Sequence, residues 1–251
     1  MKKQSDNLNL YSRSPEVVQD CTKIDTRTKV VFVLILIVIF INHIRFDKTF
    51  LKNVPMEPFA EPIQETITDG KPFVEKTPVG EVFITPIADY KLYGRVYDKH
   101  YRPSRLYLAS VYPYDVSIGF GNFKEKEVYK AVKVRMASTV SYLSWSGPTW
   151  QNHLSQYYSN QDEMIHEFTN NHLRPANKNV KRGIQKLKKK DIVYIEGYLV
   201  KIVHNVKDGR IEKGISSTSR NNRETFRGDN GSGSCEQIYV TRIVSRHGDF
   251  R

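Results

Sequence analysis

One apolar run dominates the hydrophobic pattern of this chain, from Val30 to Ile41 without a polar residue. A bilayer core of about 30 Å requires roughly 20 helical residues, and residues 29–46 approach this length when Arg45 extends to the interface. A cleaved signal peptide and a buried strand are the alternatives, but no small-residue cleavage site follows the run. The pattern therefore predicts a transmembrane signal anchor at residues 29–46. Residues expected within the span are Val30, Leu34, Ile37 and Ile41.

Composition divides the rest of the chain into three segments. Residues 1–28 form a polar tail without a sustained period, as is typical of disordered termini. Residues 47–87 hold six of the eleven prolines, which favours a semi-rigid, extended stalk, although residues 80–87 can also form an edge strand. Residues 88–251 form the body, which is long enough to bury a core of its own.

Basic residues flank the apolar run at similar density on both sides, so the positive-inside rule discriminates weakly here. The short tail and the large body favour a cytoplasmic N-terminus. We therefore expect a single-pass protein of the bacterial inner (plasma) membrane, with the lipid bilayer as one partner and the body outside the cytoplasm. Cys21 and Cys235 would then lie on opposite sides of the membrane, so no intrachain disulfide is expected.

Alternation of apolar and polar residues predicts a mainly β (α+β) body. Residues 90–97 alternate in the manner of a half-buried strand. Residues 191–203 form a longer apolar stretch, in which Ile192, Tyr194 and Glu196 fall on one face. Gly197, in the middle of this stretch, is placed for a bulge or a sharp bend. The last strand is expected at residues 236–244.

One short basic helix is predicted at residues 177–189. Val180, Ile184 and Leu187 recur at i, i+4 and i+7 and form an apolar stripe, and Asn177 is suited to cap the helix at its N-terminus. Lysines and one arginine cover the opposite face. The chain carries 39 Lys and Arg against 27 Asp and Glu, a net charge of +12, and much of this excess follows residue 176.

A basic face beside aromatic strands is typical of nucleic-acid-binding proteins. The same charge suits an anionic membrane surface or a cell-wall polymer, and it can also reflect a lysine-rich composition without a function. Nucleic acid is disfavoured as a partner if the body lies outside the cytoplasm. The residues predicted to bind a partner are Lys188, Lys189, Lys190, Tyr194 and Tyr198.

Three short motifs carry a resemblance to known proteins. They are Asn-His-Leu-Arg-Pro-Ala at residues 171–176, Gly-Tyr-Leu-Val at residues 197–200 and Gly-Ser-Cys-Glu at residues 233–236. Together they resemble an uncharacterised family of bacterial single-pass membrane-anchored proteins. The basic helix leading into the glycine-interrupted strand also resembles small β-barrels of the OB type. The resemblance implies a transmembrane helix followed by an OB-like barrel, and it implies no activity, because folds of this kind serve many functions.

The sequence offers weak support for catalysis. No His-Glu-x-x-His or Cys-x-x-Cys motif is present, so no metal site is predicted, and the glycines near residue 230 lack the spacing of a nucleotide-binding loop. No cofactor is expected. The sharpest catalytic hypothesis is Cys235 as a nucleophile with His172 or His204 as its base. Glu236 or Asp229 would orient the base. Against this hypothesis, a lone cysteine is commonly a small buried hydrophobe.

These observations favour a non-catalytic interaction or scaffold module of a bacterial envelope assembly, tethered to the membrane and contacting an envelope protein. The first alternative is a membrane-tethered nucleic-acid-binding module. The second is a hydrolase or transpeptidase that depends on Cys235.

Overall fold

The computed structural model describes residue 25 and residues 28–38, 51–78, 80–102, 111–137, 140–206, 211–215 and 234–251. For residues 205, 206, 211–215, 234 and 235 only the backbone is described. The chain consists of two compact units, Met1–His43 and Ile44–Arg251. In the first unit the described element is a helix at residues 28–38.

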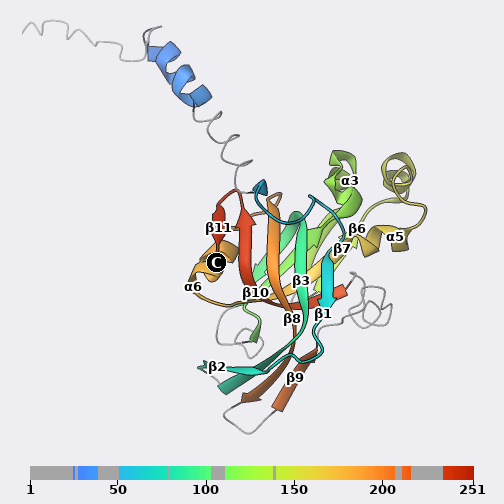
Figure 1. The fold of residues 1–251 in the computed structure, drawn as a ribbon. Helices are drawn as coiled ribbons and strands as arrows, with labels where there is room; N and C mark the ends of the chain where they lie inside the picture. The colour runs from blue at the N-terminus through green and yellow to red at the C-terminus, as the bar shows by residue number, and fades with distance from the viewer. Residues whose placement is uncertain are drawn as a thin grey trace, which may run out of the picture. The chain divides into compact units, whose positions relative to one another are not determined.

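The second unit contains β-strands with short helices between them (Figure 1). The elements, in chain order, are β1 (Ile63–Thr66), β2 (Phe73–Thr77), β3 (Gly80–Tyr101), β4 (Tyr114–Gly119), η1 (Gly121–Lys124), α3 (Lys126–Ala131), β5 (Lys133–Ala137), β6 (Val140–Ser144), α4 (Gly147–Thr149), η2 (Trp150–Leu154), α5 (Gln161–His166), β7 (Phe168–Pro175), α6 (Lys178–Lys186), β8 (Ile192–Val206), β9 (Ile211–Ile215), β10 (Ser234–Ser245) and β11 (Gly248–Phe250). This confirms the prediction of a mainly β body.

Five of these strands close into a ring in the order β3-β4-β7-β10-β8, because β8 also pairs with β3. Within the ring β7 and β10 run parallel, whereas the other four pairs are antiparallel. Gly197 allows the close approach of β8 and β10, since a Cβ there would lie 2.1 Å from the Tyr239 carbonyl oxygen. The ring therefore has a barrel-like arrangement, with α6 in the connection from β7 to β8.

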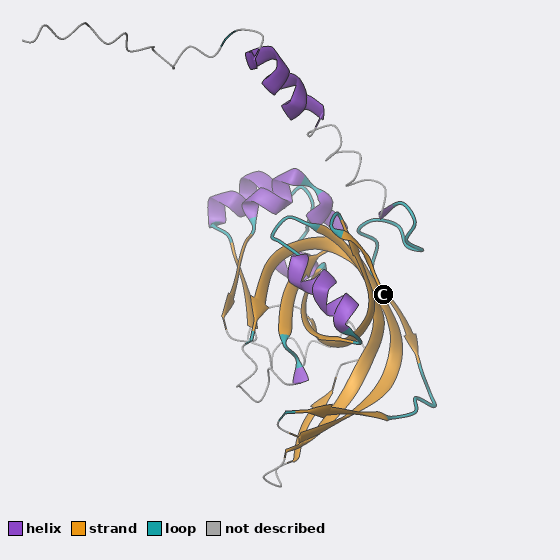
Figure 2. Ribbon diagram, turned by 90° about the vertical axis from the view of Figure 1, so that its left-hand side faces the viewer, coloured by secondary structure: helices purple, strands orange, loops and turns teal. Residues whose placement is uncertain are grey.

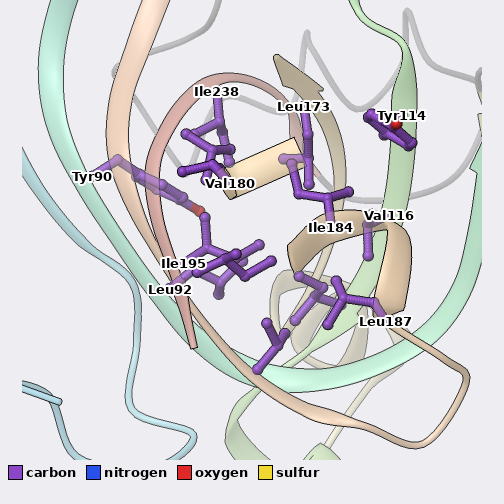
Figure 3. Packing of buried hydrophobic residues seen from close by; sticks show 14 of the residues in the cluster. Tyr90, Leu92, Tyr114, Val116, Leu173, Val180, Ile184, Leu187, Ile195 and Ile238 are labelled. Carbon is purple, nitrogen blue, oxygen red and sulfur yellow. The ribbon is translucent and has the colours of Figure 1, made fainter. Parts of the chain in front are cut away.

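Helix α6 lies across one end of the ring and closes it (Figure 2). Val180, Ile184 and Leu187 project from this segment into the interior, among side chains of β3, β4, β7, β8 and β10 (Figure 3). The Asn177 side chain accepts hydrogen bonds from the backbone N–H groups of Asn179 and Val180. The predicted helix, its cap and its apolar stripe are confirmed.

Two additions extend beyond the ring. At one end β3 and β8 continue past the barrel and pair with β2 and β9. Between β4 and β7, the segment from η1 to α5 forms its own apolar cluster around Phe123, Leu154 and Met164. Within this segment β5 and β6 form a separate two-stranded sheet.

The prediction of a transmembrane helix at residues 29–46 is wrong. Among the described residues, no helix combines the length and the apolarity needed to cross a membrane. The described residues of this segment form a helix at residues 28–38. Val30, Leu34 and Ile37 lie on this helix with about half of their side chains exposed, and Ile41 lies outside the described residues.

The stalk predicted at residues 47–87 instead contains β1, β2 and the first residues of β3. Prolines fit this arrangement where no ladder hydrogen bond is required. Pro86, for example, lies at an irregularity in the register between β3 and β8. Residues 80–87 do lie in a strand, but it is not an edge strand, because residues 80–84 pair with β2 on one side and with β8 on the other.

Candidate functional site

Within the described residues of the second unit, α6 and the turn that follows it form a strongly basic surface. We call it the basic surface, and its seven members are Lys178, Lys181, Arg182, Lys186, Lys188, Lys189 and Lys190. All seven are exposed, and no acidic residue occurs between residues 176 and 190. The surface arises directly from the amphipathic sequence, because the apolar stripe of α6 faces the barrel interior and directs the cations outward.

Few carboxylates neutralise the basic surface. Among the described residues, Lys189 is its one member with an ion pair, which joins Lys189 Nζ to Asp98 Oδ1 at 3.2 Å. Asp191, the first acidic residue after the turn, is almost fully buried and contacts Arg246 Nε at 2.8 Å and His247 Nε2 at 2.9 Å. Most of the positive charge therefore faces solvent.

A lysine from β3 attaches the end of α6 to the barrel. Lys99 Nζ donates hydrogen bonds to the carbonyl oxygens of Ile184, Gln185 and Leu187, at 3.3, 2.8 and 2.6 Å. Burial lowers the pKa of Lys99, nearby Lys188 lowers it further, and Asp191 acts in the opposite direction. The cation adds a charged donor to carbonyl groups at the C-terminus of the helix, where the helix dipole favours positive charge. The basic surface therefore has a fixed support.

An exposed aromatic ring lies two residues further along the same strand. Tyr101 is 50% exposed, and its ring packs against that of Tyr114 with centroids 5.2 Å apart. Tyr114 is buried in the barrel, and burial raises the pKa of its hydroxyl, partly offset by the neighbouring Gln185 side chain. Tyr114 contacts both Tyr101 and Gln185 of α6, and Lys99 of the same strand is bonded to the end of α6. Tyr101 therefore lies near the helix that carries the basic surface.

A second polar group covers the outer side of β4 and β7. Asp115 accepts two hydrogen bonds from Arg102, at 2.7 Å from Nε and 2.5 Å from Nη2, and contacts His172 Nδ1 at 2.5 Å. Arg174 is paired with Glu75 of β2, which also accepts a hydrogen bond from the Tyr239 hydroxyl at 2.9 Å. We call this group the outer-wall network. Its members on β4 and β7 are buried, so the network fixes neighbouring segments against the barrel.

The structure separates the residues that the sequence predicted to bind a partner. Lys188, Lys189 and Lys190 belong to the basic surface. Tyr194 is fully buried against Tyr93 and Val244, and its hydroxyl donates a hydrogen bond to Glu196 at 3.0 Å. Tyr198 is partly buried beside the cluster of Val82 and Ile84. The two tyrosines therefore do not extend the basic surface.

The catalytic candidates are closer together than their sequence distance suggests. In the parallel pair of β7 and β10, Cys235 lies opposite Asn170, and Gln237 lies opposite His172. His204 lies on β8 opposite Val82. The group that orients His172 is Asp115, which sequence reasoning missed because its role depends on the pairing of β4 with β7.

The remaining features give no further chemistry. Within the described ranges, no group of three or more His, Cys, Asp or Glu side chains could hold a metal ion. A mainly apolar cavity of about 540 Å³ lies beside β3 and β8, where Tyr93 and Ile192 form one wall. The rest of its lining comes from the segment that precedes β1, namely Leu51, Lys52, Val54, Met56, Glu57 and Pro58.

Comparison with known proteins adds no family to these observations. No protein-family model, curated protein or solved structure matches the chain. The resemblance to membrane-anchored bacterial proteins therefore stays a prediction, and a functional assignment rests on the geometry of the molecule itself.

Proposed function

We propose that the unit Ile44–Arg251 is a non-catalytic module that binds an anionic partner through the basic surface. The observation that carries this proposal is the exposure of seven cations within residues 178–190 with no acidic residue among them. A polyanion releases its counterions on contact with such a surface, which favours binding at low salt. The order of the five ring strands, with α6 between β7 and β8, supports an OB-type assignment, and OB-type barrels commonly serve as binding modules.

Inorganic polyphosphate is a suitable probe, because it carries charge without other recognition groups. We expect the 251-residue chain to bind polyphosphate with an affinity that falls steeply with salt. The triple variant Lys188→Gln/Lys189→Gln/Lys190→Gln should bind at least about tenfold more weakly at low salt. The matched control is Lys126→Gln/Lys130→Gln/Lys133→Gln, which removes three exposed lysines from α3 and β5. Equal weakening in both triple variants would show that net charge alone, rather than the basic surface, is responsible.

The partnership of this module with an envelope protein stays a prediction, and the basic surface offers a direct way to examine it. An acidic protein partner that binds the basic surface would compete with polyphosphate for the same lysines. If the Lys188–Lys190 substitutions leave the affinity for the protein partner unchanged, the partner contacts another part of the chain.

The outer-wall network supports a second candidate function, a hydrolase that depends on Cys235. The specific observation is the 2.5 Å contact of Asp115 with His172, on the strand that pairs with the strand of Cys235. A cysteine activated by a histidine reacts quickly with alkylating reagents near neutral pH. In a Cys21→Ser background, labelling of Cys235 by iodoacetamide should be fast and should slow at least about tenfold in His172→Asn. Slow labelling of the folded parent chain would eliminate this candidate.

A further inference from the structure

We infer that the anionic partner of the basic surface is single-stranded nucleic acid, and that Tyr101 stacks on one of its bases. This inference rests on the proposed function and names the partner of the same surface. It depends on a feature that phosphate binding alone does not require, an aromatic ring presented beside the cations. Proteins that bind single strands combine a positively charged track with aromatic side chains on which bases stack.

Tyr101 has the properties of a stacking residue. In the described part of Ile44–Arg251, the exposed residues among Phe, Trp and Tyr are Tyr101 and Tyr142. Tyr101 is supported from beneath by Tyr114, at 5.2 Å and a tilt of 37°, and Tyr114 is 1% exposed. A ring held on a buried ring loses little conformational freedom when a base covers its open side.

The cations lie along a line that suits an extended polymer. From Lys178 to Lys186 the axis of α6 advances about 12 Å at ~1.5 Å per residue, and Lys188, Lys189 and Lys190 follow in the turn after the helix. Lys99, two residues before Tyr101, is bonded to the end of α6, which holds the ring and the track in a fixed relation. A compact anion would occupy only part of this surface, whereas a strand of several nucleotides can contact its cations and the ring together.

The chemistry of the partner distinguishes nucleic acid from other polyanions. A lipid headgroup surface or polyphosphate offers negative charge but no planar ring, so neither gains from Tyr101. Bases are planar and stack on tyrosine regardless of their identity. We therefore expect little preference for sequence, together with a clear preference for strands that carry bases.

The decisive comparison uses two oligomers of about 12 nucleotides, within the site sizes of roughly 4–16 nucleotides seen for OB domains. One is oligothymidylate, and the other is an abasic strand with the same sugar–phosphate backbone. Fluorescence anisotropy with the 251-residue chain should show oligothymidylate binding about tenfold more tightly than the abasic strand, as one stacked base can supply. Tyr101→Leu should abolish this difference, whereas the matched control Tyr142→Leu should preserve it.

The outcomes separate this inference from the proposed function. In one outcome, both strands bind equally, Tyr101→Leu has no effect, and the triple Lys188–Lys190 variant binds both strands more weakly. The surface would then bind phosphates without bases, and this inference would fail while the proposed function stands. Preferential binding to vesicles of anionic phospholipid over oligothymidylate would also overturn it. If no polyanion binds at low salt, the proposed function fails as well. Thermal unfolding of each variant shows that the fold is retained.

Discussion

Lys99 Nζ and the Leu187 carbonyl oxygen lie 2.6 Å apart, although 88 residues separate them in the chain. This contact joins the long strand β3 to the end of α6, the helix that closes the barrel and carries the basic surface. It also explains why a charged group is half-buried here, because the ammonium group meets three carbonyl oxygens.

Replacing Lys99 should therefore destabilise the fold. Lys99→Met retains the aliphatic stem but removes the ammonium donor from the helix carbonyls, and we expect a loss of about 1–3 kcal/mol in the free energy of unfolding. Urea denaturation measures this loss, and Lys126→Met, at an exposed position of α3, serves as the control. Equal stability of the two variants would show that the Lys99 contacts contribute nothing.

Asp115 should be among the residues most sensitive to substitution. Asp115→Ala removes the partner of the buried Arg102 and of His172, and an uncompensated buried charge costs about 3–5 kcal/mol. Lys189→Ala breaks the exposed pair with Asp98 and should cost less than about 1 kcal/mol. Calorimetric unfolding of both variants tests this ranking, and a small effect at Asp115 would contradict the structural role of the outer-wall network.

Replacing Gly183 by alanine should destabilise the fold, although the same replacement normally stabilises a helix. Glycine within a helix costs about 1 kcal/mol relative to alanine, but a Cβ at Gly183 would lie 2.5 Å from Ile243 Cγ2 and 2.8 Å from the Phe250 ring. We expect Gly183→Ala to lower stability by about 1–2 kcal/mol, because overpacking of a core outweighs the gain in propensity. At Gly147 a Cβ meets no atom within 4 Å, so the control Gly147→Ala should leave stability unchanged. Urea denaturation compares both variants with the parent, and a Gly183→Ala chain more stable than the parent would show that overpacking does not outweigh helix propensity here.

The pH dependence of stability should contain a contribution from Glu167. Burial raises the pKa of this carboxyl group, although hydrogen bonds from Tyr158 and the Asn122 backbone lower it in part. Between its ordinary pKa and the raised value, the folded state binds more protons than the unfolded state, so stability falls as the pH rises through this window. Glu167→Gln cannot titrate, and its stability should vary less with pH over the same window. The measurement is the urea midpoint of unfolding of the parent and of Glu167→Gln at several pH values in this window. If the two midpoints change with pH in the same way, Glu167 does not contribute to the pH dependence of stability.

Local sequence patterns were sufficient to predict α6 and β8. The spacing of Val180, Ile184 and Leu187, with Asn177 before them, determined the helix, its cap and its buried side. The alternation around Gly197 determined a strand with Tyr194 on one face and Ile195 on the other. Both predictions succeeded because each depends on neighbours within about eight residues, where backbone geometry fixes which side chains share a face.

The transmembrane prediction rested on apolarity alone, and among the described residues no helix has both the length and the apolarity needed to cross a membrane. The tyrosines predicted to bind a partner were misplaced for a different reason. Their burial depends on which segments pack outside β8, and Tyr194 is covered by Tyr93, Val244 and residues before β1, which no local pattern reveals.

By itself the sequence determined the basic charge, the amphipathic helix and the mainly β character of the body. The tertiary structure decided that Tyr101 lies near the helix that carries the cations, that Lys99 is bonded to the end of this helix, and that Asp115 contacts His172. The physical reason is that the pairing of β3, β4 and β7 brings these residues together, although they are far apart in the chain. This pairing depends on how the whole core packs around α6, which composition and local periodicity do not predict.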